Sequence, residues 1–188
     1  MFKREKGSYG YIKRCKKQDI IKMILYVFVA LGIFITGLFT NKMSYQNIFT
    51  ILAILFVLPW ARVLVEFIMF FPYKTPEKES YDKVAAVAPK EAKVASDMVI
   101  TSSEKSMGLS FVVIGNGYLF GLIMNEKQDV NYIQKYLKNG VYNWSNQYQV
   151  KIHKNMKDFL RDVEQAKEKE IPEVERENVE SYIFSLVI

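Results

Sequence analysis

Cysteine and histidine are nearly absent from this 188-residue chain, which contains one of each, Cys15 and His153. A single cysteine cannot form a disulfide within the chain, which agrees with a reducing compartment such as the cytosol. One histidine and one cysteine also cannot complete the ligand set of a zinc site. We therefore expect no metal and no cofactor to be bound.

Familiar catalytic motifs are lacking as well. His153 has no Gly-x-Ser-x-Gly elbow to work with, so a Ser-His-Asp hydrolase is not indicated, and His153 is interpreted as an ordinary surface histidine. The stretch Gly115-Asn116-Gly117 lacks the lysine and the following helix of a phosphate-binding loop, and its residues favour a tight hairpin turn instead. Whether the chain is an enzyme stays open, and a non-enzymatic role is the stronger hypothesis.

Charge is scarce in residues 20–71, which predict two membrane-spanning helices at about 20–39 and 47–67, joined by a short polar turn. The first run is too long for a signal peptide and shows no small-residue cleavage pattern. The second run could end at Trp60 with Arg62 reaching back to the headgroups, or continue to Phe70 with Arg62 and Glu66 paired. We prefer an intermediate end near Val65, and we expect Pro59 to kink the helix.

The net charge of +6 is unevenly distributed, with +5 in residues 1–19, +2 in 20–71 and −1 in 72–188. A nearly neutral domain argues against a nucleic-acid partner. Basic flanks favour the cytoplasmic side, so we expect a basic cytoplasmic tail (1–19), both termini in the cytoplasm, and a two-pass protein of the cell (plasma) membrane. The lipid bilayer would be contacted by these membrane-interface residues: Lys13, Arg14, Lys16, Lys17, Trp60 and Arg62.

Residues 72–188 are long enough for one cytosolic α/β domain with its own core. The apolar patterns predict a helix, three strands, a helix, a strand, a helix and a final strand over residues 179–188. The two clearest strands flank Asn116-Gly117 and are apolar on both faces, so we expect them at the centre of a covered sheet. The expected fold class is α/β (or α+β), a mixed sheet covered by helices on both faces, preceded by the transmembrane hairpin.

The helix–three strands–helix–strand order is similar to the core of restriction-endonuclease-like folds. Such nucleases need an acidic residue on the second strand and Glu-x-Lys on the third, to hold a metal and activate water. Here those strands read Leu-Ser-Phe-Val-Val-Ile and Tyr-Leu-Phe-Gly-Leu-Ile-Met, without a carboxylate. The resemblance therefore concerns the fold order alone and does not imply nuclease activity.

An aromatic group in the second half of the domain is the remaining candidate for a binding surface. Aromatic side chains are favoured in interface cores, although core packing is their commoner use. Its members are Tyr132, Tyr136, Tyr142, Trp144 and Tyr148.

These observations favour a two-pass membrane protein whose cytosolic domain binds a protein partner or assembles with itself, as a binding or scaffold module. One alternative is a membrane-tethered hydrolase or transferase with an unfamiliar site around Asp97, Glu104 and Lys105. Another is an accessory subunit of a larger membrane complex.

Overall fold

The structure, a computed structural model, describes residues 5–188 and divides the chain into two compact units. One unit, Lys13–Pro72, is called the hairpin here. The other, called the domain, consists of Tyr73–Ile188 together with the N-terminal residues up to Ile12. Lys3 and Arg4, counted above in the basic tail, lie outside the described residues.

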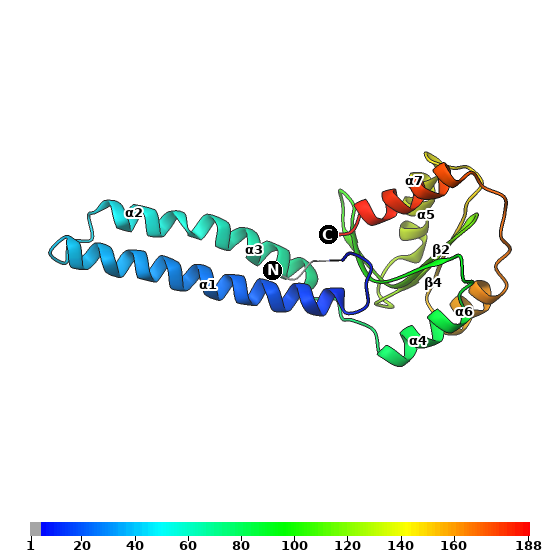
Figure 1. Ribbon diagram of the computed structural model, residues 1–188, viewed down its shortest axis with the longest axis horizontal. Coiled ribbons are helices and arrows are strands. Elements are labelled where there is room, and N and C mark those ends of the chain that lie inside the picture. Colours follow the sequence, from blue (N-terminus) through cyan, green and yellow to red (C-terminus); the bar gives the residue numbers. More distant parts are fainter. Residues whose placement is uncertain (1–4) are drawn as a thin grey trace. The chain divides into compact units, whose positions relative to one another are not determined.

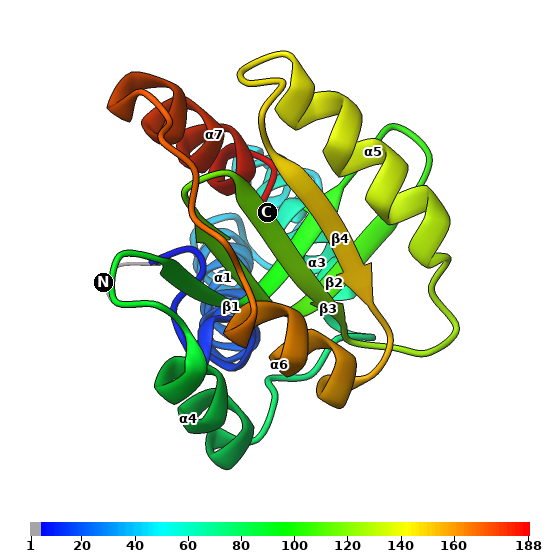
Figure 2. The same cartoon turned by 90° about the vertical axis from the view of Figure 1, so that its right-hand side faces the viewer.

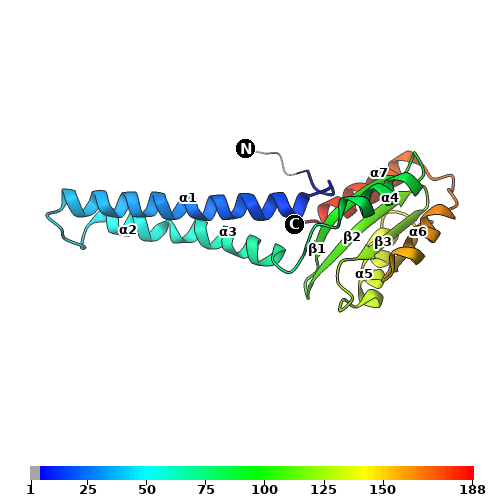
Figure 3. The ribbon, with the colours of Figure 1, turned by 90° about the horizontal axis from the view of Figure 1, so that it is seen from below.

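The hairpin consists of two antiparallel helical arms (Figure 1; Figure 3). The first arm belongs to α1 (Tyr11–Thr40), and the second is formed by α2 (Ile48–Leu55) and α3 (Val57–Phe70). Asn47 caps α2, because its side chain accepts a hydrogen bond from the Thr50 N–H at 2.9 Å. Near the turn the arms approach closely, since a Cβ at Gly37 would lie 2.5 Å from the Phe49 Cβ.

The interruption between α2 and α3 has a local cause. Pro59 has no N–H to donate to the carbonyl of Leu55, and its ring crowds that carbonyl. The regular helix accordingly breaks at Phe56, three residues before the proline. The structure therefore has an interruption of the helix at Phe56, where a kink at Pro59 was predicted.

A mixed sheet forms the centre of the domain, with the strand order β1-β2-β3-β4 (Figure 2). The pairs β1–β2 and β2–β3 are antiparallel, and β3–β4 is parallel. Asn116 and Gly117 form the tight turn between β2 and β3, and Gly117 takes the positive φ of 87° that this turn requires. The strands are β1 (Lys93–Thr101), β2 (Ser106–Gly115), β3 (Tyr118–Ile123) and β4 (Gln149–His153).

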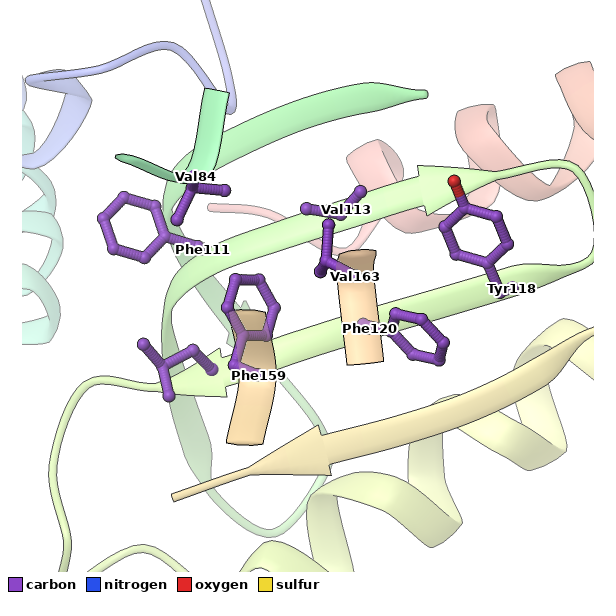
Figure 4. Packing of buried hydrophobic residues seen from close by; sticks show 8 residues of the cluster. Val84, Phe111, Val113, Tyr118, Phe120, Phe159 and Val163 are labelled. Carbon is purple, nitrogen blue, oxygen red and sulfur yellow. The ribbon is translucent and has the colours of Figure 1, made fainter. Parts of the chain in front are cut away.

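Helices cover both faces of the sheet, as the apolar pattern of its central strands predicts. On one face, α4 (Lys78–Val87) and α6 (Met156–Glu164) enclose an apolar cluster (Figure 4). Its buried members come from both helices and from alternate positions of β2 and β3: Val84, Phe111, Val113, Tyr118, Phe120, Leu122, Phe159 and Val163.

The opposite face is covered by α5 (Val130–Tyr142) and α7 (Glu173–Ser185), which also pack on each other. An Asn-Gly pair often ends a helix, but α5 continues past Asn139 and Gly140 to Tyr142. The glycine instead provides room for α7, because a Cβ at this position would lie 1.8 Å from the Tyr182 hydroxyl. Its role is therefore close helix packing.

The prediction of a final strand over residues 179–188 is wrong, because α7 runs to Ser185. Val179, Ile183 and Val187 are all buried and recur every four residues, which is helical spacing. The preceding helix is also shorter than expected and ends at Glu164. Residues 165–172, called the strap here, are irregular and lead to α7.

The outer edge of β1 is paired with both ends of the described chain. The Ser96 N–H donates to the Gly7 carbonyl at 2.8 Å, and the Ile188 N–H donates to the Val99 carbonyl at 3.1 Å. A β-bridge also joins Ile100 to Val187. These contacts protect an edge that would otherwise be open to another strand. They also make residues 5–12 part of the domain.

Candidate functional site

Two helices are long and apolar enough to cross a membrane, Tyr11–Thr40 and Ile48–Phe70. In each, only 6% of the apolar window is buried, whereas the core helix of a water-soluble protein would be mostly buried. The exposed face of α1 changes character abruptly along its length. Lys13, Arg14 and Lys17 are exposed on it, and from Ile20 to Ile35 the exposed residues are apolar.

The remaining interface candidates are Lys16 in α1 and Trp60 and Arg62 in α3. The Lys16 ammonium donates to the Phe71 carbonyl at 3.0 Å and lies 5.8 Å from the Phe71 ring, so it links the two arms. Arg62 has 84% of its side chain exposed and lies 3.8 Å from Glu66, while Trp60 is partly buried. Trp60 and Arg62 lie near the middle of the candidate span Ile48–Phe70, so their place at a membrane interface stays a prediction.

The five aromatic candidates divide into three environments. Tyr148 is buried, with 8% of its surface exposed. Tyr132 and Tyr136 are partly buried and stacked, with ring centroids 6.4 Å apart, and their hydroxyls contact the Ser102 hydroxyl and the Thr101 carbonyl. Tyr142 and Trp144 are 64% and 46% exposed. Their exposure therefore favours Tyr142 and Trp144 as a contact surface. The ring centroids of Trp144 and Tyr182 are 6.3 Å apart.

The residues of the alternative enzyme hypothesis lie in different surroundings. Asp97 is fully buried in β1 with a positive φ of 57°. Glu104 and Lys105 are exposed in the turn between β1 and β2, and the Lys105 ammonium lies 4.3 Å from the Tyr132 ring centroid. A 260 Å³ pocket beside this turn is lined by Lys105 but not by the two acids.

A second group of polar side chains surrounds a cavity that the sequence reasoning missed. The cavity has a volume of 330 Å³ and lies between the strap, the end of α6, and strands β3 and β4. It is called the lysine pocket here. Its charged and amide side chains are Lys151, Lys167, Lys169, Asp162, Gln149 and Gln165.

The lysine pocket is lined by one ion pair, and His153 lies behind the acid of that pair. The Lys151 ammonium donates to Asp162 Oδ2 at 2.8 Å, and this hydrogen bond is the main reason that the pKa of Asp162 lies below its usual value. His153 Nε2 lies 3.5 Å from the same oxygen. Burial lowers the pKa of His153 despite the opposing effect of Asp162, so the imidazole is neutral at pH 7.

The strap is held in place by Lys169. Its N–H donates to the Asn116 carbonyl at 3.0 Å, and its ammonium donates to the Gln147 carbonyl at 2.6 Å. The side chain lies against Gly117, where a Cβ would come 2.9 Å from the Lys169 Cδ. Gln149 and Lys151 alternate with the buried Val150 and Ile152 along β4, so they lie on its more exposed face. The path of the strap brings Lys167 and Lys169 to the same face.

Among residues 5–188, no group of three or more histidine, cysteine, aspartate or glutamate side chains has a metal-binding arrangement. The exposed aromatic pair and the lysine pocket are the two surface features considered further. No protein-family model matches the chain, and neither the curated proteins nor the solved structures contain a significant match.

Proposed function

We propose that this protein anchors a binding domain to the cytosolic face of the cell membrane through a two-pass helical hairpin. In this function the domain engages a protein partner, or a second copy, through the surface around Tyr142 and Trp144. In this proposal the membrane-anchored domain acts by binding its partner and does not catalyse a reaction.

The main support for this proposal is that the domain is formed by two segments of the chain, one on each side of the hairpin. Residues 5–12 precede the first candidate span, and Tyr73–Ile188 follow the second, yet both belong to one compact unit. The Gly7 carbonyl pairs with β1, the Tyr9 hydroxyl donates to the Pro76 carbonyl at 3.2 Å, and Ile12 is buried. A unit built from both flanks requires both flanks on the same side of the bilayer. This supports two crossings of the membrane.

The distribution of charge supports the cytosolic side. Lys13, Arg14 and Lys17 are exposed at the open end of the hairpin, and the turn at its other end contains only Lys42. Short segments rich in lysine and arginine stay on the cytoplasmic side during insertion. Anionic lipids of that leaflet would attract the same side chains.

Support for partner binding comes from the exposed pair itself. Tyrosine and tryptophan are enriched at binding hot spots, because they bury a large rigid surface and still offer a polar group. In this domain Tyr142 and Trp144 lie outside the core, while the neighbouring Val141 and Ser145 are buried. A fixed backbone therefore presents both rings to solvent.

The topology can be tested by cysteine labelling, because Cys15 is the sole native cysteine. In a Cys15→Ser background, Ser44→Cys places a thiol in the hairpin turn and Ser103→Cys places one in an exposed loop of the domain. A membrane-impermeant maleimide added to intact cells should label position 44 only. Both positions should react after permeabilisation. Labelling of position 103 in intact cells would contradict the proposed orientation.

Partner binding can be tested by photo-crosslinking in living cells. A benzophenone amino acid replaces Tyr142, and the matched control replaces Asn131, which is exposed on the same helix. We expect a discrete protein adduct from position 142 and none from position 131. Equal or absent adducts from the two positions would contradict the assigned surface, whatever the topology.

A further inference from the structure

The lysine pocket brings together more positive charge than the surrounding domain would suggest. Residues 72–188 carry a net charge of −1, yet three lysines and one acid line this single 330 Å³ cavity. Lys151 is paired with Asp162, whereas Lys169 donates only to a neutral carbonyl and Lys167 is exposed on the strap. The cavity thus presents three ammonium groups against one carboxylate, with Glu168 and Glu170 beside Lys169 on the strap.

The construction of the cavity fixes the positions of these charges. Lys151 projects from β4, beside the ring of Phe120 at 6.0 Å. Lys169 is pinned at both its N–H and its ammonium, so the strap follows one path along the cavity. Strands, a helix end and a pinned strap thus converge on the same space. A cluster of this kind is more ordered than a run of lysines along an exposed helix.

The chemistry of the lining indicates the class of ligand. Ammonium groups are point-charge donors suited to phosphate oxygens, and Gln149 and Gln165 add neutral amide donors. Pockets for small ligands start at about 300 Å³, so a cavity of 330 Å³ suits a compact molecule. A nucleic acid would need a basic surface that continues beyond one cavity.

We propose that the lysine pocket binds a small phosphorylated molecule, with Lys167 and Lys151 contacting the phosphate oxygens and Lys169 holding the strap that shapes the site. This site is separate from the exposed pair Tyr142 and Trp144. It adds a soluble ligand to the proposed membrane-anchored function and does not depend on the orientation of the protein in the membrane.

The experiment uses the full chain in phosphatidylcholine nanodiscs, titrated with pyrophosphate at constant ionic strength in a calorimeter. We expect saturable binding at one site per chain. Lys167→Gln should weaken binding about tenfold, because one charge-assisted contact is lost. Gln165→Glu should weaken it at least as much by placing a second carboxylate in the pocket. Both side chains are exposed, so neither change should alter the unfolding temperature.

The matched control is Lys157→Gln, which removes an exposed lysine from α6 outside the pocket and should change the affinity less than twofold. Absence of saturable heat with the wild-type chain would overturn the proposal. So would equal losses in the Lys157 and Lys167 variants, because they would mean that pyrophosphate responds only to overall charge. Neither result would bear on the topology or on crosslinking at position 142.

Discussion

At the scale of single residues, packing decides what the glycine in α5 does. An Asn-Gly pair near the end of an amphipathic pattern usually marks a helix end, yet Gly140 lies within the helix under Tyr182. Its function depends on a side chain some forty positions away in the sequence. Local sequence therefore could not distinguish the two roles.

Replacing Gly140 by alanine should destabilise the domain by about 1–3 kcal/mol, because the clash with the Tyr182 ring outweighs the better helix propensity of alanine. In a Tyr182→Ala background the same substitution should instead stabilise by about 1 kcal/mol. Chemical denaturation of the four variants of this cycle measures the coupling. An equal effect of the substitution in both backgrounds would contradict the packing role.

His153 gives the stability of the domain a pH dependence. The imidazole lies edge-on to the rings of Phe120 and Phe159, and burial is the main cause of its lowered pKa. The unfolded chain, with the ordinary pKa of 6.5, therefore binds the proton more readily than the folded chain. Its contribution to stability is present above pH 6.5 and is lost as the pH falls through the lower, folded-state value.

We expect the unfolding temperature of the wild-type protein to decrease between pH 7.5 and pH 5, and the decrease to be smaller in His153→Gln. Thermal unfolding followed by circular dichroism over this range checks the prediction. Lys154→Gln, which changes an exposed neighbour, should retain the wild-type pH dependence. A steeper decrease in His153→Gln would contradict the assigned sign.

At the scale of elements, the N-terminal segment is the least expected part of the domain. Its basic composition suggested a solvated tail, whereas its tyrosines and glycine make the contacts. Gly7 adopts a φ of 75° against the Phe184 ring, and the Tyr9 ring lies 5.2 Å from the ring of Tyr81. Charge counting detects the lysines and overlooks the aromatic residues between them.

Tyr9→Ala should destabilise the full-length protein by about 2 kcal/mol, because it removes a partly buried ring and a hydrogen bond. Tyr9→Phe keeps the ring and should cost about 1 kcal/mol. Hydrogen exchange of β1 and α4 in detergent reports the loss, since both elements contact this segment. Unchanged protection in Tyr9→Ala would mean that the segment is not docked in solution.

The other elements differ in how clearly the sequence defines them. The hairpin helices and the β2–β3 turn follow from long apolar runs and from Asn116-Gly117, which are strong local signals. The last helix was mistaken for a strand because Tyr182 to Ile188 is rich in aromatic and branched residues. The spacing of Val179 and Ile183 was the better indicator. The lysine pocket could not be predicted at all, because an irregular segment brings Lys167 and Lys169 to β4.

At the scale of the whole molecule, the hairpin and the domain differ in how much apolar surface they expose. The large apolar residues exposed in residues 5–188 lie mostly in the hairpin, including Phe28, Phe39 and Leu58. The domain has a complete core of its own. The need for detergent should therefore reside in the hairpin alone.

Replacing Lys13–Pro72 by a flexible glycine-serine linker should give a protein that stays in the supernatant after ultracentrifugation without detergent. Its circular dichroism should show a cooperative unfolding transition. The same chain without residues 1–12 should unfold at a lower temperature, because β1 then loses its partner segment. Aggregation of the linked chain would mean that the domain needs the hairpin to fold.

The contact between Lys6 and the Val187 carbonyl joins positions 181 residues apart. During synthesis the first of these residues leaves the ribosome long before the second, and both spans are made in between. The domain can therefore close only after both helical arms have been synthesised, and in the proposed two-pass topology membrane insertion would precede the last step of folding. Until then the outer edge of β1 lacks the pairing that Val187 and Ile188 provide, and this part of the edge stays open to other strands.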